Sequence, residues 1–307
     1  MLRRIKYVFD IFAVSASAGL LVGLLQAVHP LADSFSHFRM YLLFLVLGAS
    51  LVFCLQRRWK MFAFTSVIGL IGLVSFYPVF FTLGRPAPTP VSGPEVKLVQ
   101  FNSLFDNKNP QAIVALIKRE NPDLVALQEI SAATSVILKS LETNYPEQKY
   151  CPFTGLGGVV ILSRHPASAS GCEQGSGATW MRMEIEGQPL TLVSLHLHWP
   201  YPFRQHKQID NLTPVLQKLS VPIIVAGDFN AAPWSHGVER IERATQTEVA
   251  KGVRNSLIAD IPAMGRWPIL PVDHVLASGE LFVKHIYLGE PSGSDHLPLI
   301  ANFQYSK

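Results

Sequence analysis

The feature that most constrains this 307-residue chain is the concentration of apolar residues in its first 83 positions. Three apolar stretches lie there, at residues 7–28, 35–55 and 61–83. The first and third are longer than the roughly 20 residues that span a hydrocarbon core, and the second reaches that length only with residues 35–38 included. A cleaved signal peptide explains one stretch, not three. We predict a three-helix transmembrane anchor over residues 1–84, with a buried helix of a soluble domain as the alternative for the second stretch.

Basic residues in the short flanking segments indicate the orientation of these helices. Lys and Arg are frequent before the first stretch and between the second and third, but the first loop has a single one, at Arg39; the six others are Arg3, Arg4, Lys6, Arg57, Arg58 and Lys60. The positive-inside rule then places the N-terminus in the cytoplasm and the chain after Leu83 outside it. We expect a multi-pass protein of the cell membrane with a periplasmic C-terminal domain, a placement that an even number of helices would reverse.

Residues 85–95 read RPAPTPVSGPE and predict an extended, semi-rigid linker. Residues 96–307 then form the outer domain, which is long enough for one sizeable core. The net charge is +4, and the membrane flanks hold much of the basic excess. The outer domain has no dense run of Lys and Arg. This weakens the case for a nucleic-acid substrate without excluding it, because binding to a phosphate backbone normally leaves a basic footprint.

The chain contains three cysteines. Cys54 falls in the second apolar stretch and is interpreted as an apolar packing residue. Cys151 and Cys172 flank the apolar segment GGVVILSRHP in the outer domain, where oxidising conditions permit a disulfide. Their spacing in sequence does not fix their separation in space, so the sequence leaves the bond open. No Cys and His spacing is typical of a zinc site.

Short apolar segments alternate with amphipathic ones in the first part of the outer domain, whereas strands dominate its end. We predict helices at 109–120, 133–143 and 203–219, and strands at 96–102, 122–130, 158–166, 189–200, 221–230, 272–278, 281–288 and 292–303. Mixed segments of this kind predict an α/β domain in which two sheets pack together with helices outside them.

Polar residues follow a pattern in this domain, because strand after strand ends in a group that can bind a metal or move a proton. One example is VAGDFN, in which Asp228 and Asn230 are two residues apart and so lie on one face. Such a pair taken alone is typical of a turn or a helix cap. Six strands share the pattern, which predicts that their ends converge on one site; the residues are Asn102, Glu129, His196, Asp228 with Asn230, Asp273, and Asp295 with His296.

Carboxylate and amide oxygens suit Mg²⁺, with Mn²⁺ as the alternative ion, and Mg²⁺ keeps waters and binds substrate phosphate. A carboxylate near such an ion can activate water, and imidazoles can stabilise charge or protonate a leaving oxygen. The residues therefore predict metal-assisted hydrolysis of a phosphodiester or phosphomonoester.

The ordered motifs FN, LQE, SLH, GDFN, DHV and SDH closely resemble those of the endonuclease/exonuclease/phosphatase superfamily. This superfamily includes pancreatic deoxyribonuclease, abasic-site endonucleases, neutral sphingomyelinases and inositol-polyphosphate 5-phosphatases. The resemblance covers nearly the whole outer domain and none of the anchor. It implies a four-layer α/β/β/α sandwich, in agreement with the strand pattern.

The resemblance also implies a metal-binding role for three residues. Glu129 of LQE is similar to the principal Mg²⁺ ligand of the family. Asn102 of FN is similar to its neighbour that contacts metal or phosphate, and Asp295 of SDH to a further carboxylate of the metal site.

Catalytic roles are implied for five residues. Asp228 of GDFN resembles the group that orients or deprotonates the attacking water, and Asn230 the amide that holds phosphate or nucleophile. His296 of SDH resembles the imidazole on the scissile phosphate, and Asp273 the carboxylate that orients it. His196 of SLH matches the histidine of the deoxyribonuclease and sphingomyelinase branches.

Two further residues are expected to bind substrate. His198 lies two residues beyond His196 and shares its face, so it is either a substrate contact or a surface histidine. Arg164 of LSRHP matches a recurrent family segment, with a structural role as the alternative. The loop WPYPFRQ after His198 is apolar enough to lean on lipid, stack on a base, or simply pack on the domain.

These observations predict a membrane-anchored, extracytoplasmic, Mg²⁺-dependent phosphoesterase, acting either as a nuclease or as a phosphodiesterase of a lipid or envelope phosphate. The lipid bilayer is the expected partner of the N-terminal helices. The alternative is a catalytically silent binding or scaffold protein on the same fold. Such a protein is expected to have lost at least one of Glu129, Asp228, Asn230 or His296, and all four are present.

Overall fold

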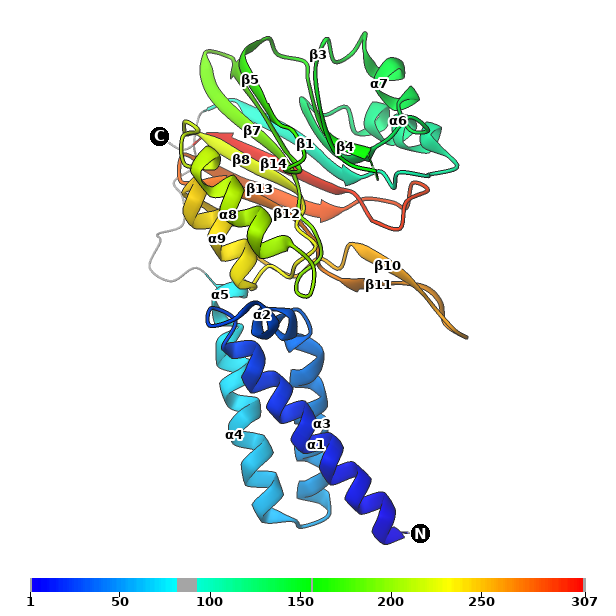
Figure 1. The fold of residues 1–307 in the computed structure, drawn as a ribbon, viewed down its shortest axis with the longest axis vertical. Coiled ribbons are helices and arrows are strands. Elements are labelled where there is room, and N and C mark those ends of the chain that lie inside the picture. Colours follow the sequence, from blue (N-terminus) through cyan, green and yellow to red (C-terminus); the bar gives the residue numbers. More distant parts are fainter. Residues whose placement is uncertain (1, 82–92, 156, 306–307) are drawn as a thin grey trace.

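The structure is a computed structural model that describes residues 2–81, 93–155 and 157–305. A bundle of helices, called the anchor after the role predicted for it, lies at one end of the molecule and a domain of two β-sheets at the other (Figure 1). Most of the predicted linker, residues 85–92, lies outside the described residues, as does the end of the third apolar stretch.

The anchor consists of α1 (Leu2–Leu24), α2 (Pro30–Ser36), α3 (Arg39–Leu55), α4 (Trp59–Ser75) and α5 (Tyr77–Phe80). Two helical segments are long and apolar enough to cross a membrane, Arg4–Leu24 and Trp59–Phe80. Helices α2 and α3 meet this criterion only together and are bent by 63°. The described anchor therefore has two candidate spans, or three if the bent pair counts as one.

Asp10 is the acidic residue of the first apolar stretch, and it forms an ion pair with Arg58. Its two carboxylate oxygens accept hydrogen bonds of 2.6 and 2.7 Å from the guanidinium of Arg58, just before α4. This bidentate pair fixes α1 against the turn between α3 and α4.

The first sheet of the domain has the strand order β13-β14-β1-β2-β4-β3. Its strands are β1 (Glu95–Asn102), β2 (Leu124–Ile130), β3 (Glu147–Thr154), β4 (Gly157–Ser163), β13 (Leu281–Leu288) and β14 (Leu299–Tyr305). Strands β1 and β2 are parallel and bring Asn102 beside Gln128. Helices α6 (Pro110–Glu120) and α7 (Val136–Leu141) cover the outer face of this sheet.

The second sheet has the order β5-β6-β7-β8-β12-β9. Its strands are β5 (Ala167–Glu173), β6 (Ala178–Ile185), β7 (Gln188–His196), β8 (Ile223–Asp228), β9 (Thr247–Val249) and β12 (Asp273–Ser278). Strands β7 and β8 are parallel and bring His196 beside Asp228. Helices α8 (Gln205–Leu216) and α9 (His236–Thr245) cover its outer face (Figure 1).

Three apolar clusters separate these layers. The central one contains residues of both sheets, such as Leu98 and Ile161 from the first and Leu192 and Ile224 from the second. The two outer clusters join each sheet to its helices. Together they form the predicted four-layer α/β/β/α sandwich.

A separate hairpin of β10 (Leu257–Ile261) and β11 (Gly265–Leu270) projects from the sandwich near the anchor (Figure 1). The sequence pattern did not predict this hairpin, nor β3, β5, β6, β9 and α9. Helix α9 begins at His236 with Ser235 as its N-cap, whose Oγ accepts from the amide of Val238.

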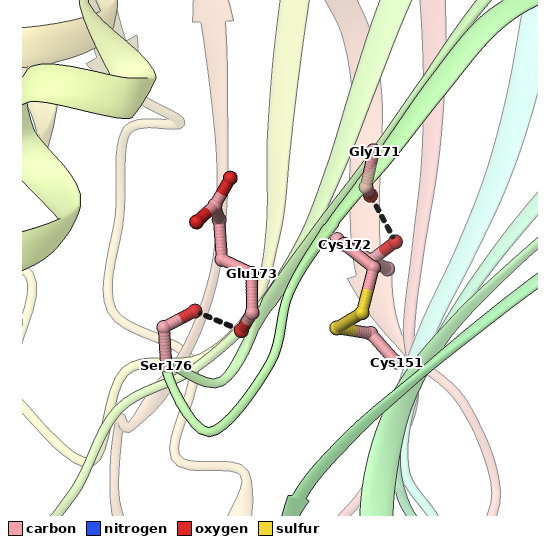
Figure 2. The surroundings of a disulfide bond; sticks show 6 residues. Cys151, Gly171, Cys172, Glu173 and Ser176 are labelled. Atoms are coloured by element: carbon pink, nitrogen blue, oxygen red, sulfur yellow. Dashed lines mark hydrogen bonds between the residues drawn. A yellow bond between two sulfur atoms is a disulfide. The ribbon is translucent and has the colours of Figure 1, made fainter.

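Cys151 and Cys172 form a disulfide, with Cα atoms 5.3 Å apart (Figure 2). Cys151 lies on β3, at the edge of the first sheet, and Cys172 on β5, at the edge of the second. The bond therefore joins the two sheets at the side of the sandwich. Among the described residues, Cys54 is the free cysteine.

Replacing both bridge cysteines, as Cys151→Ser with Cys172→Ser, is expected to destabilise the domain by about 3 kcal/mol, because the bond closes a loop of the unfolded chain. The measurement is the melting temperature of the purified full chain. Cys54→Ser is the matched control and should melt close to wild type. Equal melting of the wild type with and without reductant would contradict a stabilising role for the bond.

Candidate metal-dependent active site

Both sheets end at a common edge, and the predicted polar residues gather there. Asn102 and Glu129 come from the C-terminal ends of β1 and β2, and His196 and Asp228 from those of β7 and β8. Strand β12 runs antiparallel to β8, so its first residue, Asp273, pairs with Asp228. Asp295 and His296 lie in the loop between β13 and β14.

Glu129 owes its position to a β-bulge. The register between β2 and β4 shifts between Leu127 and Ile130, and Glu129 has a left-handed backbone with a φ of 59°. A non-glycine residue in this region is strained, and such strain is typical of functional sites. One carboxylate oxygen, Oε2, accepts from the amide of Phe105 at 3.0 Å. The other lies toward the centre of the site.

Asp228 is the centre of the cluster and is 1% exposed. Nδ2 of Asn102 donates to Oδ2 of Asp228 at 2.9 Å and to Oε1 of Glu129 at 3.1 Å, so one amide joins the two carboxylates. Oδ1 of Asp228 accepts a hydrogen bond from the backbone N–H of Asn230 at 2.8 Å. Burial raises the pKa of Asp228 to about 7, although the nearby His296 opposes the shift.

The glycine of GDFN is required by close packing at this strand end. A Cβ on Gly227 would lie 1.9 Å from the backbone oxygen of Leu195 on the neighbouring strand. The absence of a side chain lets β7 and β8 bring His196 and Asp228 level with each other.

Asp273 and His296 form a buried pair. Nδ1 of His296 and Oδ2 of Asp273 are 2.7 Å apart, and Nε2 faces Oδ2 of Asp228 at 3.8 Å. Burial would lower the pKa of His296, but the carboxylates of Asp273 and Asp228 outweigh it and raise the pKa to about 10. This histidine is therefore a cation at neutral pH, held in place by Asp273.

His196 has the opposite character. Its Nε2 lies 3.5 Å from Oδ2 of Asp228 and 3.8 Å from Oε1 of Glu129. Burial, assisted by the positive charge of His296, lowers the pKa of His196 to about 3. The site thus contains one neutral and one charged imidazole.

Sequence reasoning missed the residues that hold Asp273. Nε2 of Gln100, in the middle of β1, donates to Oδ1 of Asp273 at 2.7 Å and to Gln128 at 2.8 Å. The amide of Asp273 donates to Oγ of Ser256 at 3.1 Å. Of these residues, Gln100 could have been noticed in the sequence. It is a polar residue inside a predicted buried strand, where an amide without a partner is costly.

The charge of the cluster fits a bound divalent cation. The carboxylates of Asp228 and Asp273 are buried and that of Glu129 is half-buried. His296 is their charged partner. Burial raises the pKa of Glu129, despite hydrogen bonds from Asn102 and Phe105, as it does that of Asp228. Carboxylates that burial drives toward protonation are stabilised by a metal ion.

The choice of ligands follows from the existing hydrogen bonds. Asp228, Asp273 and His296 have potential ligand atoms all within 4.8 Å of one another. Nδ1 of His296 is bonded to Oδ2 of Asp273, and a metal ion held by Glu129 beside Asp228 would leave that bond intact. Asn102 turns its nitrogen toward these carboxylates, while its oxygen accepts from the amide of Leu104. It acts here as a donor, and ligation through its oxygen requires the amide to turn over.

The remaining predicted residues differ in their placement. Asp295 adjoins His296 and contributes to the electrostatics of both His296 and Glu129. His198 stacks near Phe153, whose ring also contacts His196, and it opens onto a cavity of about 600 Å³ beside Arg204 and Lys207.

Arg164 lies away from the other predicted site residues. It follows β4, at the end of the sheet where Leu124 begins β2, whereas Glu129 lies at the opposite end. Its guanidinium contacts Asn121 and the ring of Tyr145. The expected substrate contact is not supported by this position, and Arg164 instead anchors a loop.

The anchor reaches the loop that carries Asn230. Oδ1 and Oδ2 of Asp33, in α2, accept from the amides of His236 and Gly237 at 2.9 and 3.1 Å and so cap α9. Nε1 of Trp234 donates to the backbone oxygen of Ser36 at 2.7 Å. These contacts fix the segment after Asn230 against the anchor.

Asp33→Ala is expected to destabilise the protein by about 1–2 kcal/mol, because it leaves two helix-terminal amides without their acceptor. The readout is the melting temperature of the purified full chain in one detergent. Asp106→Ala removes an exposed aspartate of the domain and should leave the melting temperature unchanged. Equal behaviour of the two variants would show that Asp33 does not couple anchor and domain.

The four-layer sandwich carries a buried cluster of carboxylates and imidazoles at the common edge of its two sheets. The family model of the endonuclease/exonuclease/phosphatase family matches residues 99–296, and the chain belongs to that family. Enzymes of this family are in general metal-dependent hydrolases of phosphoesters.

Two proteins of Vibrio species are similar in sequence to this chain. A UPF0294 protein of Vibrio parahaemolyticus is 26% identical over 226 residues, covering 68% of this chain and 78% of the relative. A UPF0294 protein of Vibrio vulnificus is 32% identical over 171 residues, covering 49% and 55%.

Three solved structures share the fold at low identity. An endonuclease/exonuclease/phosphatase from Bacteroides vulgatus has a TM-score of 0.58 at 16% identity, covering 69% of this chain and 100% of that one. Beta toxin from Staphylococcus aureus, with bound magnesium ions, has a TM-score of 0.53 at 15% identity, covering 70% and 100%. TDP2 from D. rerio, complexed with a single-strand DNA product, has a TM-score of 0.53 at 19% identity, covering 68% and 99%.

Proposed function

We propose that this protein is a membrane-anchored phosphoesterase that uses Mg²⁺, with Mn²⁺ as the alternative, to hydrolyse a phosphodiester or phosphomonoester. The observation that carries the proposal is the side-chain amide of Asn102 joining the carboxylates of Glu129 and Asp228, beside the imidazoles of His196 and His296. Magnesium in the similar beta toxin structure supports the choice of ion.

In this proposal Glu129 is the principal metal ligand, with Asn102 and Asp295 around it. The bound ion would polarise a phosphoryl oxygen and lower the pKa of nearby water. Asp228 orients the attacking water and accepts its proton, a task suited to a buried carboxylate whose pKa is about 7. The backbone amide of Asn230 donates to Asp228, and its side chain, whose Nδ2 donates to the backbone oxygen of Leu197 at 2.8 Å, is assigned to hold the nucleophile or phosphate.

The two histidines have separate tasks in the same reaction. His296, a cation held by Asp273, faces the phosphate and stabilises the negative charge that develops there. His196 is neutral and lies between Glu129 and Asp228, where it can donate a hydrogen bond to a phosphate oxygen. His198 contacts the substrate beyond the scissile bond.

We further propose that the domain lies outside the cytoplasm, where it would meet lipid headgroups, envelope phosphates or incoming nucleic acid. The distribution of Lys and Arg around the anchor supports this orientation. A reporter fused after Leu83 should be active outside the cytoplasm. A cytoplasmic signal would contradict the orientation and the substrate classes that follow from it.

Activity should be tested on the purified full chain in nanodiscs, with Mg²⁺ or with EDTA. The substrates are plasmid DNA, vesicles containing sphingomyelin, and bis(p-nitrophenyl) phosphate, and Asp228→Ala provides the blank. Metal-dependent turnover of any of these supports the proposal. Absence of turnover in the folded protein on all three would favour the alternative, a silent binding protein.

A further inference from the structure

A cavity of about 160 Å³ lies where the anchor meets the domain. Its walls come from the anchor residues Ser34, His37 and Phe38, from the loop Trp199–Phe203, and from the segment Leu270–Val272 before β12. Asn230, one of the proposed catalytic residues, also lines it. Asn230, whose backbone amide donates to Asp228, therefore lies between the cavity and the site, and the anchor bounds the cavity on another side.

Aromatic side chains surround this cavity and remain open to solvent. Phe38, Trp199 and Phe203 are 50, 44 and 60% exposed. Exposed aromatic residues at the end of a membrane anchor are typical of the boundary between bilayer and water. A hydrocarbon chain that leaves the bilayer next to α3 would meet these rings first.

His37 supplies a second, independent observation. Its Nδ1 accepts from the amide of Ala232 at 2.9 Å, so the ring proton lies on Nε2. This Nε2 is buried and has no hydrogen-bond partner in the part of the chain that the structure describes, and the residue is 6% exposed. A buried donor without an acceptor is costly, and an acceptor oxygen on a ligand would satisfy it.

We propose that this cavity binds the hydrocarbon chain of a membrane lipid whose phosphate lies in the active site. The oxygen that pairs with His37 belongs to the headgroup side of the lipid, either to an ester or amide carbonyl or to the phosphate. A cavity of about 150 Å³ accommodates a benzene ring, so this one takes the first several methylenes while the rest stays in the bilayer. The inference rests on the proposed phosphoesterase function and assigns its substrate class.

A lipid fits these walls better than nucleic acid. One wall is the anchor itself, so the bilayer that holds α1 and α4 delivers the ligand directly to the cavity. An apolar chain packs against the aromatic rings, and an oxygen at its polar end accepts a hydrogen bond from His37. A nucleic acid could stack a base on the exposed rings, but it has no apolar chain to fill this cavity.

Chain-length selectivity tests the proposal. The probes are p-nitrophenyl ethyl phosphate and p-nitrophenyl octyl phosphate, in which water attacks phosphorus and nitrophenolate leaves. The readout is the ratio of kcat/KM for octyl over ethyl in nanodiscs with Mg²⁺. Each methylene removed from water contributes about fourfold to kcat/KM. Burial of only two of the methylenes by which octyl exceeds ethyl therefore gives the wild type a ratio of at least about 10.

Two variants should lower that ratio. Ser34→Trp fills the cavity and should reduce the ratio about tenfold, and Phe203→Ala removes a wall and should reduce it by about threefold. Tyr150→Ala is the matched control, an exposed aromatic on β3 in the other sheet, and should keep the wild-type ratio. Partitioning of the octyl ester into the nanodisc is common to all four proteins and cancels in the comparison.

Photocrosslinking provides a readout that needs no turnover. Nanodiscs of phosphatidylglycerol carry a diazirine near the carbonyl end of one acyl chain, and crosslinked peptides are identified by mass spectrometry. We expect labelled residues within 199–203 and 270–272, and loss of that label in Ser34→Trp.

The outcomes separate the two proposals. Labelling of these segments without turnover of either ester would support the lipid site and overturn the phosphoesterase function. Turnover with equal ratios in all four proteins, or cleavage of plasmid DNA with labelling confined to α1, α3 and α4, would overturn the lipid site and leave the phosphoesterase standing.

Discussion

Asp228→Ala and His296→Ala are each expected to lower kcat by about 10³-fold, the effect typical of losing a general base or the main electrostatic group of an active site. Asp228 contacts Asn102, Asn230 and both imidazoles, so its loss removes a partner of four groups of the site. The measurement is the steady-state rate on bis(p-nitrophenyl) phosphate at saturating Mg²⁺.

Matched controls separate chemistry from folding. Asp210→Ala removes an exposed carboxylate of α8, and His285→Ala removes an exposed imidazole of β13. Both should retain wild-type rates. Circular dichroism of all four variants should match the wild type, and near-normal turnover by Asp228→Ala or His296→Ala would show that the roles are assigned wrongly.

Glu129→Gln is expected to raise the Mg²⁺ concentration at half-maximal rate by about 10- to 100-fold, because an amide in place of the carboxylate weakens the metal site. Glu129 lies in a bulge with a left-handed backbone and accepts a hydrogen bond from the backbone amide of Phe105, so the substitution keeps its shape while removing its charge. The readout is a Mg²⁺ titration of the rate.

Glu186→Gln is a close control for this substitution. Glu186 is also a glutamate with a left-handed backbone, at a φ of 48°, and it lies exposed in the turn between β6 and β7. Its Mg²⁺ titration should follow that of the wild type. An unchanged titration in Glu129→Gln would exclude Glu129 as the principal ligand.

The convergence of the strand ends was predictable because it depends on local pattern. Asn102, Glu129 and Asp228 each follow a short apolar strand, and parallel strands place such ends at one edge of a sheet. The pairing of Asp273 with His296 followed from the family resemblance, and the structure places the two in contact.

Contacts between distant segments were not predictable. Gln100 reaches Asp273 only because the two sheets face each other, and Asp33 reaches His236 only because the anchor docks on the domain. Arg164 was expected at the site because LSRHP matches a recurrent family segment, but it lies at the opposite end of the sheet from Glu129. Such features depend on how elements pack, which no residue periodicity specifies.

The measurement that tests the central claim most directly is the rate of bis(p-nitrophenyl) phosphate hydrolysis by the purified full chain, first stripped of metal with EDTA and then titrated with Mg²⁺. A metal-bound hydrolase of the kind proposed should lose its activity with EDTA and regain it with Mg²⁺, while Asp228→Ala stays at background throughout. Hydrolysis that persists at full rate in EDTA, or equal rates in wild type and Asp228→Ala, would contradict it.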